Sequence, residues 1–126
     1  MKNRPDSEKS TRHRGNEAEE TAAAYLEAKG WLILDRNYSF QKAEVDIVAT
    51  DRNYIIFVEV KMRSSVRYGQ PEQAVTPAKE KQIRKAAEAW IYERKMETAV
   101  SRFDVISIVM HQNEAPRITH FEDAFR

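Results

Sequence analysis

Two apolar runs separated by a short polar link constrain the fold of this chain more than any other feature. The runs extend from Val45 to Thr50 and from Tyr54 to Met62, and the link is Asp51-Arg52-Asn53. β-Branched and aromatic residues dominate both runs, and such residues favour β-strands. Two strands of this kind around a short polar link are typical of a β-hairpin. The sequence therefore predicts a hairpin over residues 45–62.

Two helices are predicted from apolar residues that recur at helical spacing. One extends from about Asn16 to Lys29 and the other from Pro77 to about Met96. Gly30 is a usual C-terminal stop for the first, and a proline suits the first turn of the second. Their buried stripes are expected to be Ala18, Ala22, Tyr25 and Leu26 in the first helix and Ile83, Ala87, Trp90 and Ile91 in the second.

Three further strands complete the expected order of elements. They cover residues 31–40, 102–110 and 117–121, while residues 63–76 read as a loop. The order α-β-β-β-α-β-β favours an α/β layered domain over a helical bundle or a β-sandwich. A chain of 126 residues is long enough for one domain. Because residues 1–14 lack any apolar period, we expect a disordered basic arm there, followed by a single domain over residues 15–126.

The composition excludes several classes of function. The chain has no cysteine, which excludes disulfide scaffolds, thiolate zinc sites, iron–sulfur clusters and cysteine nucleophiles. It has only three glycines and no glycine-rich phosphate loop. No apolar run reaches the length of a membrane span, and the N-terminus lacks the apolar stretch of a secretory signal. We therefore expect a soluble protein of the cytoplasm.

Charged residues are distributed in blocks although the net charge is only +1. Residues 1–14 hold five basic and two acidic residues, residues 15–60 hold four and nine, and residues 61–85 hold seven and two. Such blocks can build a surface that attracts a polyanion around a site that holds a cation. Solvated helix faces are the alternative that charge counts leave open. The phosphate contacts expected to flank such a site are Arg63, Arg67, Lys79, Lys81 and Lys85.

Charged residues also interrupt both strands of the hairpin. If the turn centres on Arg52 and Asn53, the numbers of paired residues add up to 105, and Asp46 then lies opposite Glu59. In the same register Glu44 lies opposite Lys61, and all four charged groups project from one side of the sheet.

Two carboxylates held about 5 Å apart repel each other by roughly 3 kcal/mol at an effective dielectric constant near 20. A bound divalent cation offsets that repulsion, and two carboxylates with positions left for water describe a magnesium site. Such an ion activates water and stabilises charge on a phosphodiester, and a lysine beside it can hold the water or the phosphate. These are the parts of a metal-dependent nuclease. Ordinary cross-strand ion pairs of a surface hairpin remain the alternative.

Three segments resemble the YraN-like family of bacterial proteins. They are Ala43 to Ala49 (AEVDIVA), Phe57 to Ser65 (FVEVKMRSS) and Arg102 to Ile106 (RFDVI). The segments Glu19 to Gly30 and Asp123 to Phe125 are also similar, so the resemblance extends from about residue 15 to the C-terminus. It implies membership of the PD-(D/E)xK nuclease superfamily, near archaeal Holliday-junction resolvases, with a restriction-endonuclease-like core of a mixed central sheet flanked by helices.

The resemblance also implies roles for individual residues. Asp46 and Glu59 would be ligands of Mg²⁺ or Mn²⁺, Lys61 would be catalytic, and Glu19 would add an acidic group from the first helix. The chain departs from the family where alanine replaces glycine at Ala18 and at position 43, and no proline precedes Asp46. The backbone near the site is the feature that these departures put in question.

Helical geometry separates Glu19 from the neighbouring glutamates. At about 100° per residue, Glu19 lies about 60° from the centre of the apolar stripe, whereas Glu17 and Glu20 lie roughly 140° and 160° away. Only Glu19 can lean over the sheet toward the carboxylate pair. A flanking helix charge is its alternative role. Elsewhere, His13, His111 and His120 are expected at the surface, and Asp104 is expected to be structural.

The first functional hypothesis is a magnesium- or manganese-dependent endonuclease acting on DNA, with branched or damaged DNA as candidate substrates. The second is a non-catalytic nucleic-acid-binding module that keeps the nuclease fold. The third is a protein-interaction domain whose acidic hairpin only binds metal. A homodimer is plausible by analogy with junction resolvases, although the sequence shows no heptad repeat.

Overall fold

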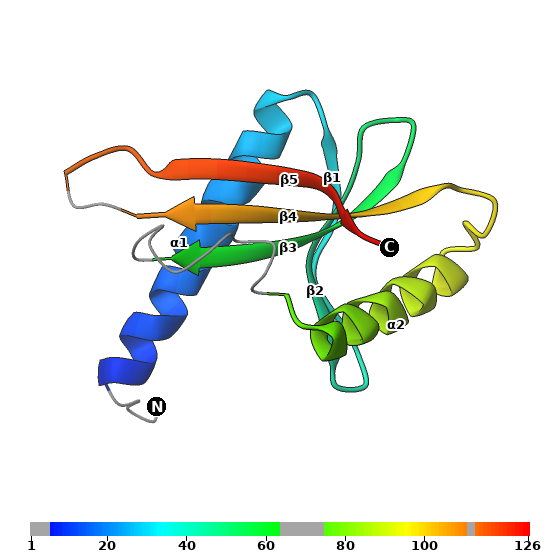
Figure 1. Ribbon diagram of the computed structural model, residues 1–126, viewed down its shortest axis with the longest axis horizontal. Helices are drawn as coiled ribbons and strands as arrows, with labels where there is room; N and C mark the ends of the chain where they lie inside the picture. Colours follow the sequence, from blue (N-terminus) through cyan, green and yellow to red (C-terminus); the bar gives the residue numbers. More distant parts are fainter. Residues whose placement is uncertain (1–5, 64–74, 111–112) are drawn as a thin grey trace.

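The computed structural model describes residues 6–63, 75–110 and 113–126, with side chains from Glu17 onward (Figure 1). Its elements follow the order α-β-β-β-α-β-β, which confirms the predicted α/β class. They are α1 (Asp6–Ala28), β1 (Leu32–Phe40), β2 (Ala43–Thr50), β3 (Ile55–Arg63), α2 (Pro77–Glu93), β4 (Ser101–Val109) and β5 (Arg117–Phe125).

The five strands form one mixed sheet in the order β1-β2-β3-β4-β5. Neighbouring strands are antiparallel except β3 and β4, which are parallel. Parallel neighbours require a crossover connection, and α2 is the helix of that crossover. The predicted mixed sheet flanked by helices is therefore confirmed.

Side chains on the two faces of the sheet pack against different helices. Successive side chains of a strand point to opposite faces of the sheet. The central strands carry apolar side chains on both faces, and each face is covered by one helix. The cluster under α1 contains Ala18, Ala22, Ala23, Leu26, Trp31, Ile47, Ala49, Ile56, Val58, Ile106 and Ile108. The cluster under α2 contains Ala43, Val45, Val48, Ile55, Phe57, Val75, Ile83, Ala86, Ala87, Trp90 and Val105.

Helix α1 begins ten residues before the start expected at Asn16. Residues 6–14, for which we expected a disordered basic arm, are helical in the structure, and residues 1–5 lie outside the described residues. The expectation rested on the missing apolar stripe. A helix that is already nucleated gains one backbone hydrogen bond for each residue added, and this needs no apolar stripe. Gly30, with a φ of 91°, follows the C-terminal end of α1 as predicted.

Helix α2 has the start that its sequence predicted. The Thr76 hydroxyl caps it by accepting the N–H of Lys79 at 3.1 Å, and Pro77 occupies its first turn. The helix ends at Glu93, three residues before the expected end. Strand β5 continues to Phe125, four residues beyond its expected end, across an irregular pairing between Phe103 and Val105 of β4. Such an irregularity breaks the alternation from which the strand was predicted.

Candidate active site

The hairpin register determines where the carboxylates of β2 and β3 lie. Ile47 pairs with Val58 and Thr50 pairs with Ile55, so paired residue numbers add up to 105 as predicted. The ladder ends at the pair of Ile47 and Val58. Beyond it the carboxylate of Asp46, and not a backbone carbonyl, accepts the N–H of Val60 at 2.8 Å. The side chain of Asp46 is thereby fixed where regular pairing of the two strands ends.

The backbone of β2 changes its alternation at Asp46. Val45 packs in the cluster under α2 and Ile47 in the cluster under α1, although residues two apart normally share a face. Opposite this point in β1, between the partners of Val45 and Ile47, Asn37 has a φ of 53°, a conformation that asparagine tolerates better than most residues. Asn37 was not singled out from the sequence.

The predicted common face for four charged groups is therefore wrong in one respect. Glu44 neighbours Val45 and so lies on the α1 side, where its charge acts on Glu19. Glu59 and Lys61 lie on the α2 side, because the valines that alternate with them pack toward α1. The change of alternation at Asp46 separates Glu44 from Lys61, while Asp46 itself stays beside Glu59.

Glu59 is only 5% exposed and lies among cationic groups from two elements. Its Oε2 atom is 3.3 Å from Nζ of Lys61, on the same strand, and 3.8 Å from Nζ of Lys79, in the first turn of α2. A buried carboxylate is stable only when it is paired or hydrogen-bonded, and these lysines supply the pairing.

Asp46 carries the most perturbed carboxyl group of the site. Burial, reinforced by the negative charge of Glu59 and more weakly by that of Glu19, raises the pKa of Asp46 to about 7, although the hydrogen bond from Val60 acts in the opposite direction. The charged form of Asp46 is therefore unfavourable in this environment. At neutral pH the group either takes up a proton or needs a cation beside it.

Glu19 is the glutamate of α1 that approaches this pair. It is half-buried, whereas Glu17 and Glu20 are exposed, as helical geometry predicted. Partial burial and the charges of Glu44 and Glu59 raise the pKa of Glu19, against a hydrogen bond with Asn37 that lowers it. The carboxyl group of Glu19 therefore lies at the edge of the site, within electrostatic reach of Glu59.

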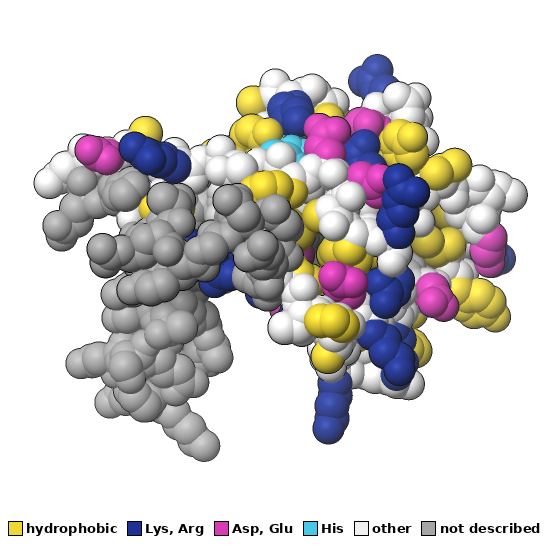
Figure 2. Space-filling view, in the orientation of Figure 1, with side chains coloured by type: hydrophobic (Ala, Val, Ile, Leu, Met, Phe, Trp, Pro, Cys, Tyr) yellow, Lys and Arg dark blue, Asp and Glu magenta, His cyan; other side chains and the backbone are white. Residues whose placement is uncertain are grey.

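The five predicted phosphate contacts do not share one location. Lys79 reaches Glu59 inside the site, and Arg63 ends β3 as a half-buried residue. Lys81 and Lys85 are exposed on α2. Arg67 lies outside the described residues. In the view of Figure 2, basic and acidic side chains are interleaved over the described part of the surface.

The residues present fit a divalent cation with few protein ligands. Within the described ranges, no three Asp, Glu or His side chains converge closely enough to hold a metal by themselves. Magnesium is usually held by one or two carboxylates and completes its shell with water and phosphate oxygens. Asp46 and Glu59 supply such a pair, and the raised pKa of Asp46 is what a neighbouring cation would reverse.

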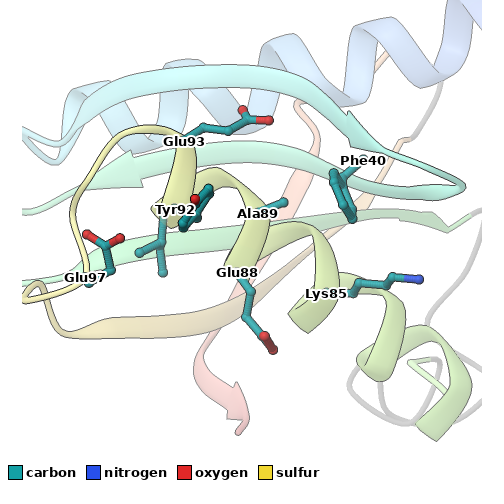
Figure 3. A pocket seen from close by; sticks show the side chains of 8 residues that line it. Phe40, Lys85, Glu88, Ala89, Tyr92, Glu93 and Glu97 are labelled. Atoms are coloured by element: carbon teal, nitrogen blue, oxygen red, sulfur yellow. The ribbon is translucent and has the colours of Figure 1, made fainter.

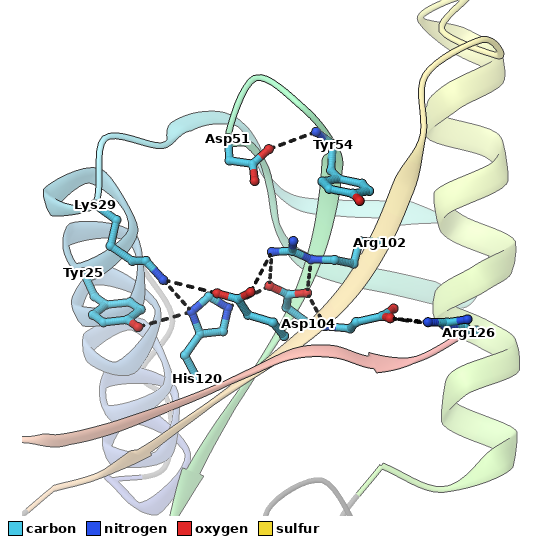
Figure 4. Close-up of polar contacts among 10 residues, drawn as sticks. Tyr25, Lys29, Asp51, Tyr54, Arg102, Asp104, His120 and Arg126 are labelled. Carbon is cyan, nitrogen blue, oxygen red and sulfur yellow. Dashed lines mark hydrogen bonds and ion pairs between the residues drawn. The ribbon is translucent and has the colours of Figure 1, made fainter.

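A second polar cluster lies under the C-terminal end of α1, away from the carboxylate pair (Figure 4). The buried Asp104 accepts two hydrogen bonds from Arg102, one from the backbone N–H of Asp123 and one from His120 at 2.7 Å. The other ring nitrogen of His120 lies 3.2 Å from the hydroxyl of Tyr25.

The structural role expected for Asp104 agrees with these contacts, whereas the surface position expected for His120 is wrong. The imidazole side chain is only 4% exposed. It packs edge-on against Tyr25 and Trp31, contacts between segments that are far apart in the sequence. Nothing in the local sequence of β5 indicates this packing.

An apolar groove of about 790 Å³ runs along α2 and includes Phe40 at the end of β1 (Figure 3). Among the predicted site residues it includes only Lys85, and Glu88, Glu93 and Glu97 line it with negative charge. It is separate from the carboxylate pair and unsuited to a polyanion.

These features define a class of protein: an α/β domain that presents an Asp–Glu pair and two lysines at the end of a β-hairpin ladder, with the glutamate buried. The model of the Uncharacterised protein family UPF0102 matches residues 18–108. The chain belongs to this family, which confirms the resemblance to YraN-like proteins.

Relatives from several bacteria share most of the chain. It is 49% identical over 111 residues to a UPF0102 protein of Geobacter sulfurreducens, covering 88% of this chain and 87% of that protein. It is 46% identical over 112 residues to one of Trichlorobacter lovleyi, covering 88% of each. It is 44% identical over 110 residues to one of Bifidobacterium longum, covering 85% of this chain and 88% of that protein.

Among the described residues, no helix is long and apolar enough to cross a membrane.

Proposed function

We propose that the protein is a magnesium- or manganese-dependent endonuclease of the PD-(D/E)xK superfamily that hydrolyses phosphodiester bonds of DNA. One observation carries this proposal. The half-buried Asp46 and the buried Glu59 lie beside each other at the end of the hairpin ladder, and Lys61 lies 3.3 Å from Glu59. Burying two carboxylates beside each other is costly, and a bound cation offsets the cost.

Asp46 and Glu59 would hold the cation, which supplies Lewis-acid stabilisation of charge on the phosphate and a more acidic bound water. The hydrogen bond from Val60 fixes the Asp46 carboxylate before any ligand arrives. Lys61 supplies a compact positive charge that can orient a water or a phosphate oxygen. Glu19 can accept a hydrogen bond from a water at the edge of the site.

The proposal is tested by incubating the protein with linear duplexes and four-way junctions in Mg²⁺, in Mn²⁺ and in EDTA. Cleavage should require the divalent ion. Lys61→Ala should lose cleavage but keep divalent binding, because lysine is not a ligand, whereas Asp46→Asn should lose both. A matched control is Lys42→Ala, which removes a lysine from the exposed turn between β1 and β2.

Two outcomes would reject this function in different ways. DNA binding without cleavage of any substrate in either metal would favour a non-catalytic nucleic-acid-binding module. Divalent binding without DNA binding would favour a metal-binding interaction domain. Preference for the junction over the duplex would extend the proposal to branched DNA, and a subunit stoichiometry of two on the junction would support a homodimer.

A further inference from the structure

Helix α2 carries a lysine on the side that faces the sheet. Its buried residues are Ile83, Ala86, Ala87 and Trp90. At about 100° per residue, Lys79 lies about 30° from the centre of this stripe, whereas Lys81 and Lys85 lie about 170° and 150° from it. The three lysines are therefore not equivalent, although the sequence suggested the same role for all of them.

The position of Lys79 is unexpected for a helix packed on a sheet. An apolar side chain there would extend the buried stripe by one turn and stabilise the packing. Lysine instead directs its ammonium group to Glu59, at 3.8 Å. Its backbone is fixed, because its N–H donates to the capping hydroxyl of Thr76. The first turn of α2 thus holds a positive charge at a defined place in the site.

Glu59 does not need this second lysine as a partner. Lys61 is already 3.3 Å from the same oxygen atom, so two ammonium groups share one carboxylate and repel each other. When a cation neutralises Glu59, both ammonium groups lose much of that attraction. Both lysines can then bind another anion, such as a phosphate.

We propose that Lys79 and Lys61 form a phosphate-binding pair across α2 and β3. Glu59 forms an ion pair with Lys79 until a divalent cation binds Glu59 and frees the lysine. This inference rests on the proposed function and names the phosphodiester of a nucleic-acid strand as the ligand. Lys79 is then a positioning residue for the phosphate. It couples cation binding to DNA binding, because one carboxylate serves both the cation and the lysine.

The test is a double-mutant cycle on DNA affinity in EDTA, with a fluorescent duplex as the probe. Glu59→Gln removes the charge that pairs with Lys79, so it should tighten DNA binding by about fivefold, the lower end of typical coupling between two sites. Combined with Lys79→Gln, the gain should fall to about twofold or less, and combined with Lys81→Gln it should stay near fivefold. Lys79→Arg should retain most of the gain, since it keeps the positive charge.

A second measurement uses the protein with its glutamate intact. Magnesium should tighten DNA binding by the wild-type protein and by Lys81→Gln, and this enhancement should be clearly smaller in Lys79→Gln, where only Lys61 remains to be released. Circular dichroism of each variant establishes that it is folded.

Equal gains from Glu59→Gln in the Lys79→Gln and Lys81→Gln backgrounds would overturn the inference, and so would no gain in any background. The cycle is read without cleavage. A wild-type protein that binds DNA but cleaves nothing would therefore refute the nuclease activity, while the cycle would still decide the role of Lys79.

Discussion

The raised pKa of Asp46 predicts a specific dependence of stability on pH. The carboxyl group has a pKa of about 7 in the folded protein against 3.8 as its ordinary value. Below pH 3.8 the group is protonated in both states and contributes nothing. As the pH rises toward 7, the unfolded chain loses this proton first, so the folded state loses stability relative to it. Above pH 7 the loss is complete.

The magnitude follows from the same pair of values. A difference of about three pKa units corresponds to about 4 kcal/mol, which is an upper limit because the Asp46 side chain is only half-buried. In a domain of this size that corresponds to roughly 15 °C in the unfolding temperature. Asp46→Asn removes the ionisation and keeps an oxygen for the N–H of Val60. The variant should therefore be more stable than the wild-type protein at pH 8 and about equal to it at pH 4.

Urea unfolding of both proteins between pH 4 and pH 8, in EDTA, measures this difference directly. Glu44→Gln is the matched control, since it removes an exposed carboxylate two residues away on the same strand. Magnesium at ten times its dissociation constant should return about 1.4 kcal/mol to the wild-type protein at pH 8 and nothing to Asp46→Asn. Parallel pH profiles for the wild-type protein and Asp46→Asn would refute the reasoning.

Three further outcomes are expected. Glu19→Gln should lower metal-dependent cleavage at least about tenfold with little change in stability, whereas the exposed Glu20→Gln should leave cleavage unchanged; a cleavage assay on the two variants decides this. Asp104→Asn should cost about 3 kcal/mol in urea unfolding at pH 7, because it removes the buried carboxylate that pairs with Arg102 and His120. Burial alone would raise the pKa of Asp104, but its hydrogen bonds outweigh burial and lower the pKa. The stability that the Asp104 carboxylate contributes should therefore disappear as the pH falls below 3.8. Parallel loss of stability by the wild-type protein and Asp104→Asn below that pH would contradict this prediction. Gly30→Ala should cost about 1 kcal/mol through backbone strain at positive φ, since a methyl group meets no atom within 4 Å, and thermal unfolding measures it.

Much of the fold could be predicted because its signals are local. The register of β2 against β3 follows from the polar link that they share, and the observed pairing of Ile47 with Val58 agrees with it. The start of α2 follows from Pro77, which suits the first turn of a helix. Element ends were less accurate. β5 extends beyond an irregularity that the sequence does not indicate.

The site was only partly predictable because its contacts join distant segments. The sequence indicated the proximity of Asp46 and Glu59, since both belong to one hairpin. It did not indicate that Asp46 would accept the N–H of Val60, because this requires a change of alternation within β2. Lys79 was assigned to the surroundings of the site, since a helical stripe does not show which part of the sheet it covers.

The sequence by itself determined the order of the elements, the hairpin register and the chemical groups available to a site. Each of these depends on residues that are close in the chain. Only the tertiary structure decided that Lys79 reaches Glu59 while Lys81 does not, and that His120 is buried against Asp104. Those contacts depend on how α1 and α2 are placed on opposite faces of the sheet, and that placement is set by packing of the whole domain and not by any local pattern.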